Sequence, residues 1–373
     1  NILKGNLLLH AHLYRMTEKL TPALQKDLRR MLLIASEYID SMIEISHQRG
    51  WLETTLQVIR FAQCVKQGLF RGADPLQQLP YLDEEARKEI TKAAASKETA
   101  IKEFLAAPEQ EKKGLNKLTA EQRADLLKTC ALIPQRELAL ELYVEAEEEE
   151  ESDDEGDDAA ANGENKKMKG SVELTNGNKQ AEVVAISGKD IYESDLITIR
   201  ITMTRKNTPA PKKGTLSRTD PALAPRFPAV IRENLWVVLA NKVAKGREEE
   251  AVIHAIEKIS DSHKVIDKKL KAAHHTIQHE IRFMAPPRQG DYEMQLYVFS
   301  DTYLGLDEVL NVPFSVRPAS ELPAYAPHPD DAGLDDEPTL FEQVMTANAD
   351  ADDSSDEEEE ETKKPKQVGN GDK

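Results

Sequence analysis

The chain has 373 residues, a length that allows two or three domains, but only 39% of them are hydrophobic while 31% are charged. This composition excludes a chain that packs throughout, and it predicts one or two modest cores joined by disordered segments. No apolar run approaches the about 20 residues that a helix needs to span a bilayer. The chain begins at Asn1 rather than Met, so we expect a piece of a longer protein.

The net charge of −18 is unevenly distributed. Residues 145–158 and 330–361 contain 11 and 15 acidic side chains and no Lys or Arg. The rest of the chain has 41 acidic and 49 basic side chains, so it is mildly basic. The acidity therefore belongs to two short runs.

Residues 1–133 are predicted to form an all-helical bundle. Thr21 is expected to cap a helix that has Pro22 in its first position and ends near Gly50. This helix has an apolar stripe at three- and four-residue spacing, and a second such stripe follows Gly50. The first stripe is formed by Leu24, Leu28, Leu32, Ala35 and Ile39, and the second by Leu52, Leu56, Ile59, Ala62, Val65 and Leu69.

Two shorter helices are expected after a loop that is bracketed by Pro75 and Pro80. Asp83 begins one of them with negative charge at its N-terminus, and Thr119 with Gln122 fits a capping box for the other.

From residue 134 the hydrophobic period changes from helical to alternating, which is typical of strands. The sequence predicts an immunoglobulin-like sandwich over residues 134–318, with Trp236 in its core and a disordered acidic insertion at about 145–170. Asn176-Gly177 is a plausible hairpin turn. Residues 319–373 are expected to be a disordered acidic tail. The core strands are expected at 138–144, 196–204, 235–240, 252–259, 276–284, 292–300 and 311–316.

The sequence contains no recognisable catalytic or cofactor site, so we expect neither an enzyme nor a bound cofactor. Gly188-Lys189 lacks the other residues of a phosphate-binding loop, and Cys64 and Cys130 are expected to be buried and reduced. His275 and His279 are four residues apart but have no third ligand, so a metal site is not expected.

His328-Pro329-Asp330 is the tripeptide with which J-domains stimulate chaperones. In this chain it lies between prolines and acidic residues rather than between two helices, so we interpret it as a chance match.

Several motifs together resemble a known cassette of a helical bundle and a fibronectin-type sandwich. They span residues 2–317 and are Leu7-Leu8-Leu9-His10-Ala11-His12-Leu13, Arg15-Met16, Gly50-Trp51-Leu52, Leu76-Gln77-Gln78-Leu79-Pro80, Trp236-Val237-Val238 and Ser300-Asp301-Thr302-Tyr303-Leu304-Gly305-Leu306-Asp307. We expect the first to be a buried helix, Trp51 to pack after Gly50, and the last to form a tight connection after a strand. The cassette occurs in the membrane J-protein of the endoplasmic-reticulum Sec translocon and in a group of RNA helicases.

The resemblance to the translocon J-protein implies a cytosolic region of an endoplasmic-reticulum membrane protein. Its implied partners are the translocation channel and a basic translocon subunit. Upstream membrane spans and a lumenal J-domain that recruits the chaperone BiP are implied outside this chain. The acidic tail is the implied contact with the basic subunit, through Asp350, Asp352, Asp353, Asp356, Glu357, Glu358, Glu359, Glu360 and Glu361.

Ser354, Ser355 and Ser152 each have Glu three residues later, so an acid-directed kinase would add charge there. The alternative function is a nucleic-acid-binding accessory cassette of an RNA helicase. Against it, Lys113-Gly114-Leu115-Asn116 has one glycine where a phosphate clamp needs two, and no aromatic-plus-basic interleaving indicates base stacking, so we expect no nucleic-acid partner. A generic scaffold, and a tail that masks the basic body, remain further alternatives.

Overall fold

The computed structural model describes residues 2–144, 190–207, 221–242, 251–260 and 276–322. These residues form helices followed by strands, and the chain divides into a compact unit, Asn1–Ser320, and a second unit, Glu321–Lys373. The predicted insertion at 145–170, the Asn176-Gly177 turn and the tail beyond residue 322 lie outside the described residues.

The first helical group consists of α1 (Ile2–Leu13), α2 (Pro22–Gln48) and α3 (Leu52–Gln67). As predicted, Thr21 caps α2 by accepting a hydrogen bond from the Leu24 N–H, and Pro22 occupies the first turn. The apolar stripes of α2 and α3 are largely buried against each other and against the strands. The expected packing of Trp51 is wrong, because its side chain is 55% exposed beyond the end of α2.

The second helical group contains η2 (Pro75–Gln78), α4 (Glu84–Ala93), α5 (Ala100–Ala106) and α6 (Ala120–Leu132). Asp83 caps α4, and the predicted capping box of Thr119 and Gln122 is present at α6. The loop expected between Pro75 and Pro80 begins with a 3-10 turn. This group has its own hydrophobic core, separate from that of α1–α3.

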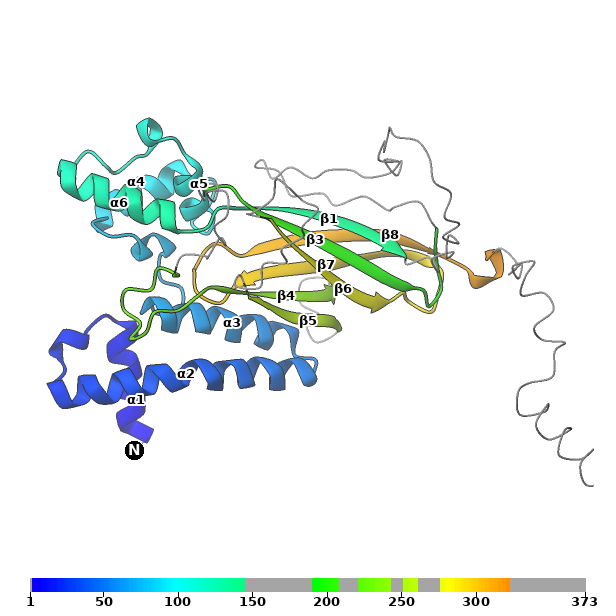
Figure 1. Cartoon of the computed structure of the whole chain (residues 1–373), viewed down its shortest axis with the longest axis horizontal. Helices are drawn as coiled ribbons and strands as arrows, with labels where there is room; N and C mark the ends of the chain where they lie inside the picture. Colours follow the sequence, from blue (N-terminus) through cyan, green and yellow to red (C-terminus); the bar gives the residue numbers. More distant parts are fainter. Residues whose placement is uncertain (1, 145–189, 208–220, 243–250, 261–275, 323–373) are drawn as a thin grey trace, which may run out of the picture. The chain divides into compact units, whose positions relative to one another are not determined.

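The described strands form two sheets (Figure 1). The three-stranded sheet has the order β1-β3-β6 and the five-stranded sheet has the order β2-β8-β7-β4-β5, antiparallel except for β2 with β8. The strands are β1 (Arg136–Val144), β2 (Ile191–Tyr192), β3 (Leu196–Arg205), β4 (Asn234–Asn241), β5 (Ile253–Ser260), β6 (Thr276–Met284), β7 (Gly290–Ser300) and β8 (Glu308–Arg317). All seven predicted core strands are present, and their ends shift by a few residues.

The two sheets share one hydrophobic core. The predicted apolar face of β3, formed by Ile197, Ile199, Ile201 and Met203, is buried there together with Leu235, Val237 and Leu239 of β4. The immunoglobulin-like classification, and the domain boundaries near residues 133 and 318, stay predictions.

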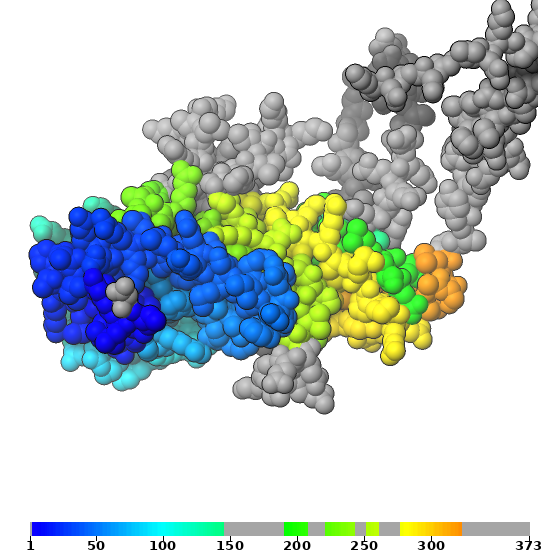
Figure 2. All heavy atoms as spheres, turned by 90° about the horizontal axis from the view of Figure 1, so that it is seen from below, coloured from blue at the N-terminus to red at the C-terminus, as the bar shows by residue number. Residues whose placement is uncertain are grey.

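Strand β4 is buried on both faces, which corrects the predicted position of Trp236. Trp236, Val238 and Ala240 point away from the core between the sheets and pack with residues of α2 and α3. The space-filling view shows α1–α3, in blue, as a continuous layer beside the strands (Figure 2). The five-stranded sheet is thus enclosed by the other sheet on one face and by helices on part of the other.

Candidate functional site

The segment most specific to the resemblance, residues 300–307, connects β7 to β8 and is here named the junction loop. The Ser300 hydroxyl oxygen accepts hydrogen bonds from the N–H groups of Thr302, at 3.1 Å, and Tyr303, at 3.0 Å. Gly305 has φ of +77°, in the left-handed region that favours glycine. The predicted tight connection after the strand is therefore confirmed.

Three glutamine side chains from the helices bind the backbone of the junction loop. Gln63 and Gln67 of α3 donate to the carbonyl oxygens of Ser300, at 2.7 Å, and Thr302, at 3.0 Å. Gln78 of η2 donates to the Leu304 carbonyl oxygen and accepts from the Leu304 N–H, each at 2.9 Å. Since these backbone groups are buried, the glutamines replace the partners that water would otherwise supply.

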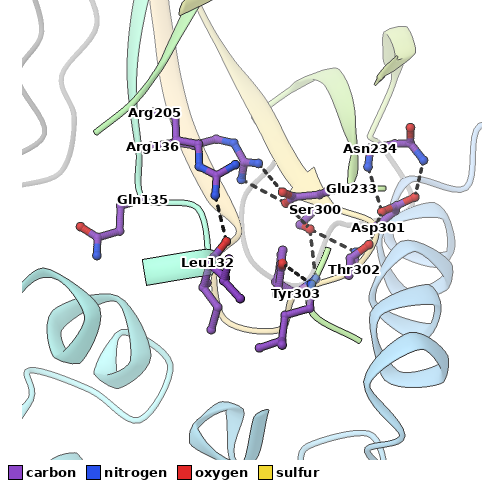
Figure 3. Close-up of polar contacts among 12 residues, drawn as sticks. Leu132, Gln135, Arg136, Arg205, Glu233, Asn234, Ser300, Asp301, Thr302 and Tyr303 are labelled. Atoms are coloured by element: carbon purple, nitrogen blue, oxygen red, sulfur yellow. Dashed lines mark hydrogen bonds and ion pairs between the residues drawn. The ribbon is translucent and has the colours of Figure 1, made fainter. Parts of the chain in front are cut away.

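A buried ion pair lies beside these glutamines. Lys66 Nζ of α3 is 2.6 Å from Asp301 Oδ2, and the two side chains are only 9% and 3% exposed. Asp301 also accepts hydrogen bonds from the N–H of Asn234, at 3.0 Å, and from its side-chain amide, at 2.8 Å (Figure 3). One carboxylate therefore connects α3, the start of β4 and the junction loop.

A second carboxylate, Glu233, connects the junction loop to the other sheet. It accepts a hydrogen bond from the Ser300 hydroxyl at 2.6 Å and forms a bidentate pair with Arg136 at the start of β1 (Figure 3). Tyr303 is buried, and its hydroxyl accepts the Leu223 N–H at 2.8 Å. Burial raises the pKa of this hydroxyl, so it stays protonated. The junction loop thus fixes both sheets and both helical groups to one another.

Asp307, the last residue of the junction loop, is poorly compensated. Gln63 Nε2 donates to its Oδ1 at 2.8 Å, and the nearest guanidinium nitrogen, Nε of Arg60, is 3.7 Å from Oδ2. Burial raises the pKa of Asp307 to about 6, and the Gln63 hydrogen bond and the Arg60 charge only partly oppose this shift. The carboxylate is therefore held charged at neutral pH at a cost to stability.

Replacing Asp307 with asparagine is expected to make the folded state more stable at pH 7.5 and to have a much smaller effect at pH 4.5. The folded-state pKa lies above the unfolded value, so the stability contributed by Asp307 is complete below the unfolded pKa and is lost as pH rises through about 6. The gain at pH 7.5 is expected to be about 1 to 2 kcal/mol, measured by urea unfolding from pH 4.5 to 7.5. An equal difference between the two proteins at every pH would contradict this.

The junction is built to hold parts together. Its hydroxyl, amide and carboxylate groups are engaged by other groups of the chain, as in a satisfied polar network. Among the residues that the structure describes, no group of three His, Cys, Asp or Glu side chains is arranged to hold a metal ion. Cys64 and Cys130 are free and buried as predicted, and burial raises the pKa of each thiol to about 11.

The residues predicted to bind a partner or to be phosphorylated all lie outside the described ranges, so the structure does not test these predictions. Of the two histidines for which no metal site was expected, His279 is described, and its Nε2 is 2.6 Å from Glu257 Oε2. The residues outside the described ranges are His275, Gly188, Lys189, Asp350, Asp352, Asp353, Asp356, Glu357, Glu358, Glu359, Glu360, Glu361, Ser354, Ser355, Ser152 and the tripeptide at 328–330.

The sequence analysis missed the polar partners of the junction loop. Three polar side chains of α3 are buried next to the predicted apolar stripe: Gln63, Lys66 and Gln67. With them, the C-terminal end of the helix is buried on nearly all sides. Their spacing of three and four residues was the available signal, because such residues lie on one helix face. Nothing in the local sequence pairs them with residues more than 230 positions later.

Residues 2–313 match the family described as "Sec63 Brl domain". The chain is 24% identical over 314 residues to a U5 small nuclear ribonucleoprotein 200 kDa helicase of Caenorhabditis elegans. This alignment covers 84% of this chain and 11% of the helicase. It is 23% identical over 346 residues to the DnaJ protein ERDJ2A of Arabidopsis thaliana. That alignment covers 82% of this chain and 44% of ERDJ2A. The chain thus spans less than half the length of these relatives. None of the described helices is long and apolar enough to cross a membrane.

Proposed function

Because the chain belongs to the Sec63 Brl domain family, we propose that it is a non-enzymatic protein-interaction region of the endoplasmic-reticulum protein translocon. In this proposal it lies on the cytosolic side of the membrane and docks on the translocation channel and on a basic neighbouring subunit. Membrane spans and a J-domain that recruits a lumenal chaperone belong to other parts of the protein. The role is to support post-translational protein import.

The observation that carries the proposal is the acidic segment that follows the family match. The match ends at residue 313, and residues 350–361 contain nine acidic side chains and no basic one. A segment of this charge is complementary to a Lys/Arg-rich partner and would compete with nucleic acid for any basic surface. The matches to DnaJ proteins are consistent with this choice, although helicases match equally well.

The junction loop supports a mechanical role for the cassette. Docking costs less free energy when the contacting surfaces are already held in place, because fewer side chains and loops become ordered on binding. The buried pair of Lys66 with Asp301 and the three glutamines hold the helices against the sheets in this way. A rigid cassette that binds one state of a channel more tightly shifts the channel toward that state.

The second candidate is an accessory cassette of an RNA helicase. It is supported by the 24% identity to the U5 small nuclear ribonucleoprotein helicase over 84% of this chain. In this reading the mildly basic body, rather than the acidic segment, would contact the partner.

Deleting residues 350–361 is expected to abolish binding to a short Lys/Arg-rich peptide that resembles the basic subunit. The intact chain is expected to bind this peptide with micromolar affinity, weakening as salt is raised because ions screen exposed charges. The measurement is fluorescence anisotropy with the peptide labelled, over a series of salt concentrations. A control chain in which these nine acidic residues become Gln and Asn keeps the length and removes the charge.

Unchanged peptide binding by the deleted chain, together with a gain in affinity for single-stranded RNA, would place the helicase candidate first. If binding depends on the segment, glutamate substitutions at Ser354 and Ser355 are expected to strengthen it, since each adds negative charge.

A further inference from the structure

A groove of about 490 Å³ lies outside the junction, between the first helical group and the segment that leads into β4. In Figure 1 this segment, in yellow-green, runs beside α1 and α2 before it enters the sheet. The lining of the groove includes Glu18, Arg29, Pro225, Arg226, Phe227 and Pro228.

Two guanidinium groups that line the groove have no acidic partner among the residues that the structure describes. Arg29 comes from α2 and Arg226 from the segment before β4, and both side chains are exposed. Among the described residues, neither forms an ion pair or a side-chain hydrogen bond. Of the described residues that line the groove, Glu18 alone is acidic. The groove therefore carries an excess of positive charge.

Further positive charge behind Arg226 reinforces this excess. Arg15 is half-buried and donates to the carbonyl oxygens of Gly68 and Gln77, both at 3.0 Å, and it pairs with no carboxylate in the described part of the chain. Burial, followed by the charges of Arg226 and Arg87, lowers the pKa of Arg15 to about 10. Burial is also the largest cause that lowers the pKa of His12, and Arg226 and Arg15 add to it. An anion near Arg226 would relieve this repulsion.

The remaining wall of the groove is apolar and held in place. Pro225 and Pro228 flank Phe227, whose side chain is 8% exposed and belongs to the core of the first helical group. Proline has a fixed φ, so this wall loses little conformational freedom when a ligand binds. An apolar side chain can lie against it while acidic neighbours reach the two arginines.

We propose that this groove is a docking site for an acidic polypeptide segment that carries an apolar anchor residue. Charge complementarity selects the acidic partner, because each free guanidinium can form a bidentate pair with a carboxylate. A peptide fits better than single-stranded nucleic acid for two reasons. Among the described residues of the lining, two cations have no acidic partner, whereas a single-stranded nucleic acid presents one phosphate per nucleotide. The rings of His12 and Phe227 are buried rather than open to base stacking.

The test uses the whole 373-residue chain and a labelled peptide of about ten residues. The peptide is rich in Glu and Asp around a central Leu-Pro pair, and its extended length is about 33 Å. We expect salt-sensitive binding that weakens about tenfold in Arg226→Gln and in Arg29→Gln, which is the loss expected for one charge-assisted contact. Arg226→Lys is expected to lose less, since it keeps the charge. Arg232→Gln is the control, because Arg232 is exposed in the same segment but lines a different cavity.

Equal peptide affinity in Arg226→Gln, Arg29→Gln and Arg232→Gln would overturn the proposal, as would tighter binding of a single-stranded RNA that depends on Arg226. Unchanged thermal unfolding of each variant ensures that a loss reflects the groove. The test of this groove can be told apart from the test of the proposed translocon function, because its probe is acidic while the probe for residues 350–361 is basic.

Discussion

Replacing Lys66 with methionine is expected to lower the free energy of unfolding by about 3 to 5 kcal/mol. Methionine has a similar length, but it leaves Asp301 buried without its cation, and the loss of one partner of a buried pair has a cost of this order. The Lys66 and Asp301 side chains are 9% and 3% exposed, so water cannot replace the lost contact. Urea unfolding followed by circular dichroism measures the difference.

Lys88→Met is the matched control for this substitution. Lys88 Nζ lies 2.6 Å from Glu84 Oε1, but both side chains are largely exposed, so the expected loss is under about 1 kcal/mol. Equal effects of Lys66→Met and Lys88→Met would show that the buried pair does not hold the junction. The double variant Lys66→Met with Asp301→Asn is expected to recover part of the loss, because no buried charge then remains.

Replacing Gly305 with alanine is expected to destabilise the fold by roughly 2 to 4 kcal/mol. An added Cβ would lie 2.8 Å from the Ile101 side chain and 2.9 Å from Pro75 Cβ, closer than such atoms can approach. The left-handed backbone, with φ of +77°, adds about 1 to 2 kcal/mol to the cost of overpacking. Thermal unfolding of both proteins measures the loss, and it is expected to be accompanied by faster proteolysis.

Gly72→Ala separates the two causes. Gly72 has the same φ of +77°, but no atom lies within 4 Å of an added Cβ. Only the backbone cost of about 1 to 2 kcal/mol is therefore expected there. If Gly305→Ala and Gly72→Ala lowered the free energy of unfolding equally, the close approach of the junction loop to η2 and α5 would contribute nothing to the loss at Gly305.

The helices were predictable because their signals are local. Thr21 and Pro22 mark the start of α2, and Thr119 with Gln122 forms the capping box of α6, since caps depend on residues within one turn. The strands were predictable for the same reason, and the alternation from Ile197 to Met203 identifies the buried face of β3. Their pairing order could not be derived, because β3 lies between β1 and β6 rather than beside β4.

Trp236 shows why the core could be predicted only in part from the sequence. Its strand is apolar throughout, and such a run does not tell which face meets a sheet and which meets a helix. The structure places Leu235 and Val237 between the sheets and Trp236 against α2 and α3. In this helix-facing position the indole N–H has no hydrogen-bond partner among the described residues, which no strand pattern predicts.

The sequence by itself determined the order of helices and strands, the family motifs and the separation of acidic from basic charge, because each depends on neighbouring residues or on composition. Tertiary structure alone decided the junction and the arginine-lined groove. Lys66 and Asp301 are 235 residues apart, and Arg29 and Arg226 are 197 apart. Buried polar groups take whichever partner the packing of distant elements brings within hydrogen-bond distance, and that distance is not encoded in local spacing.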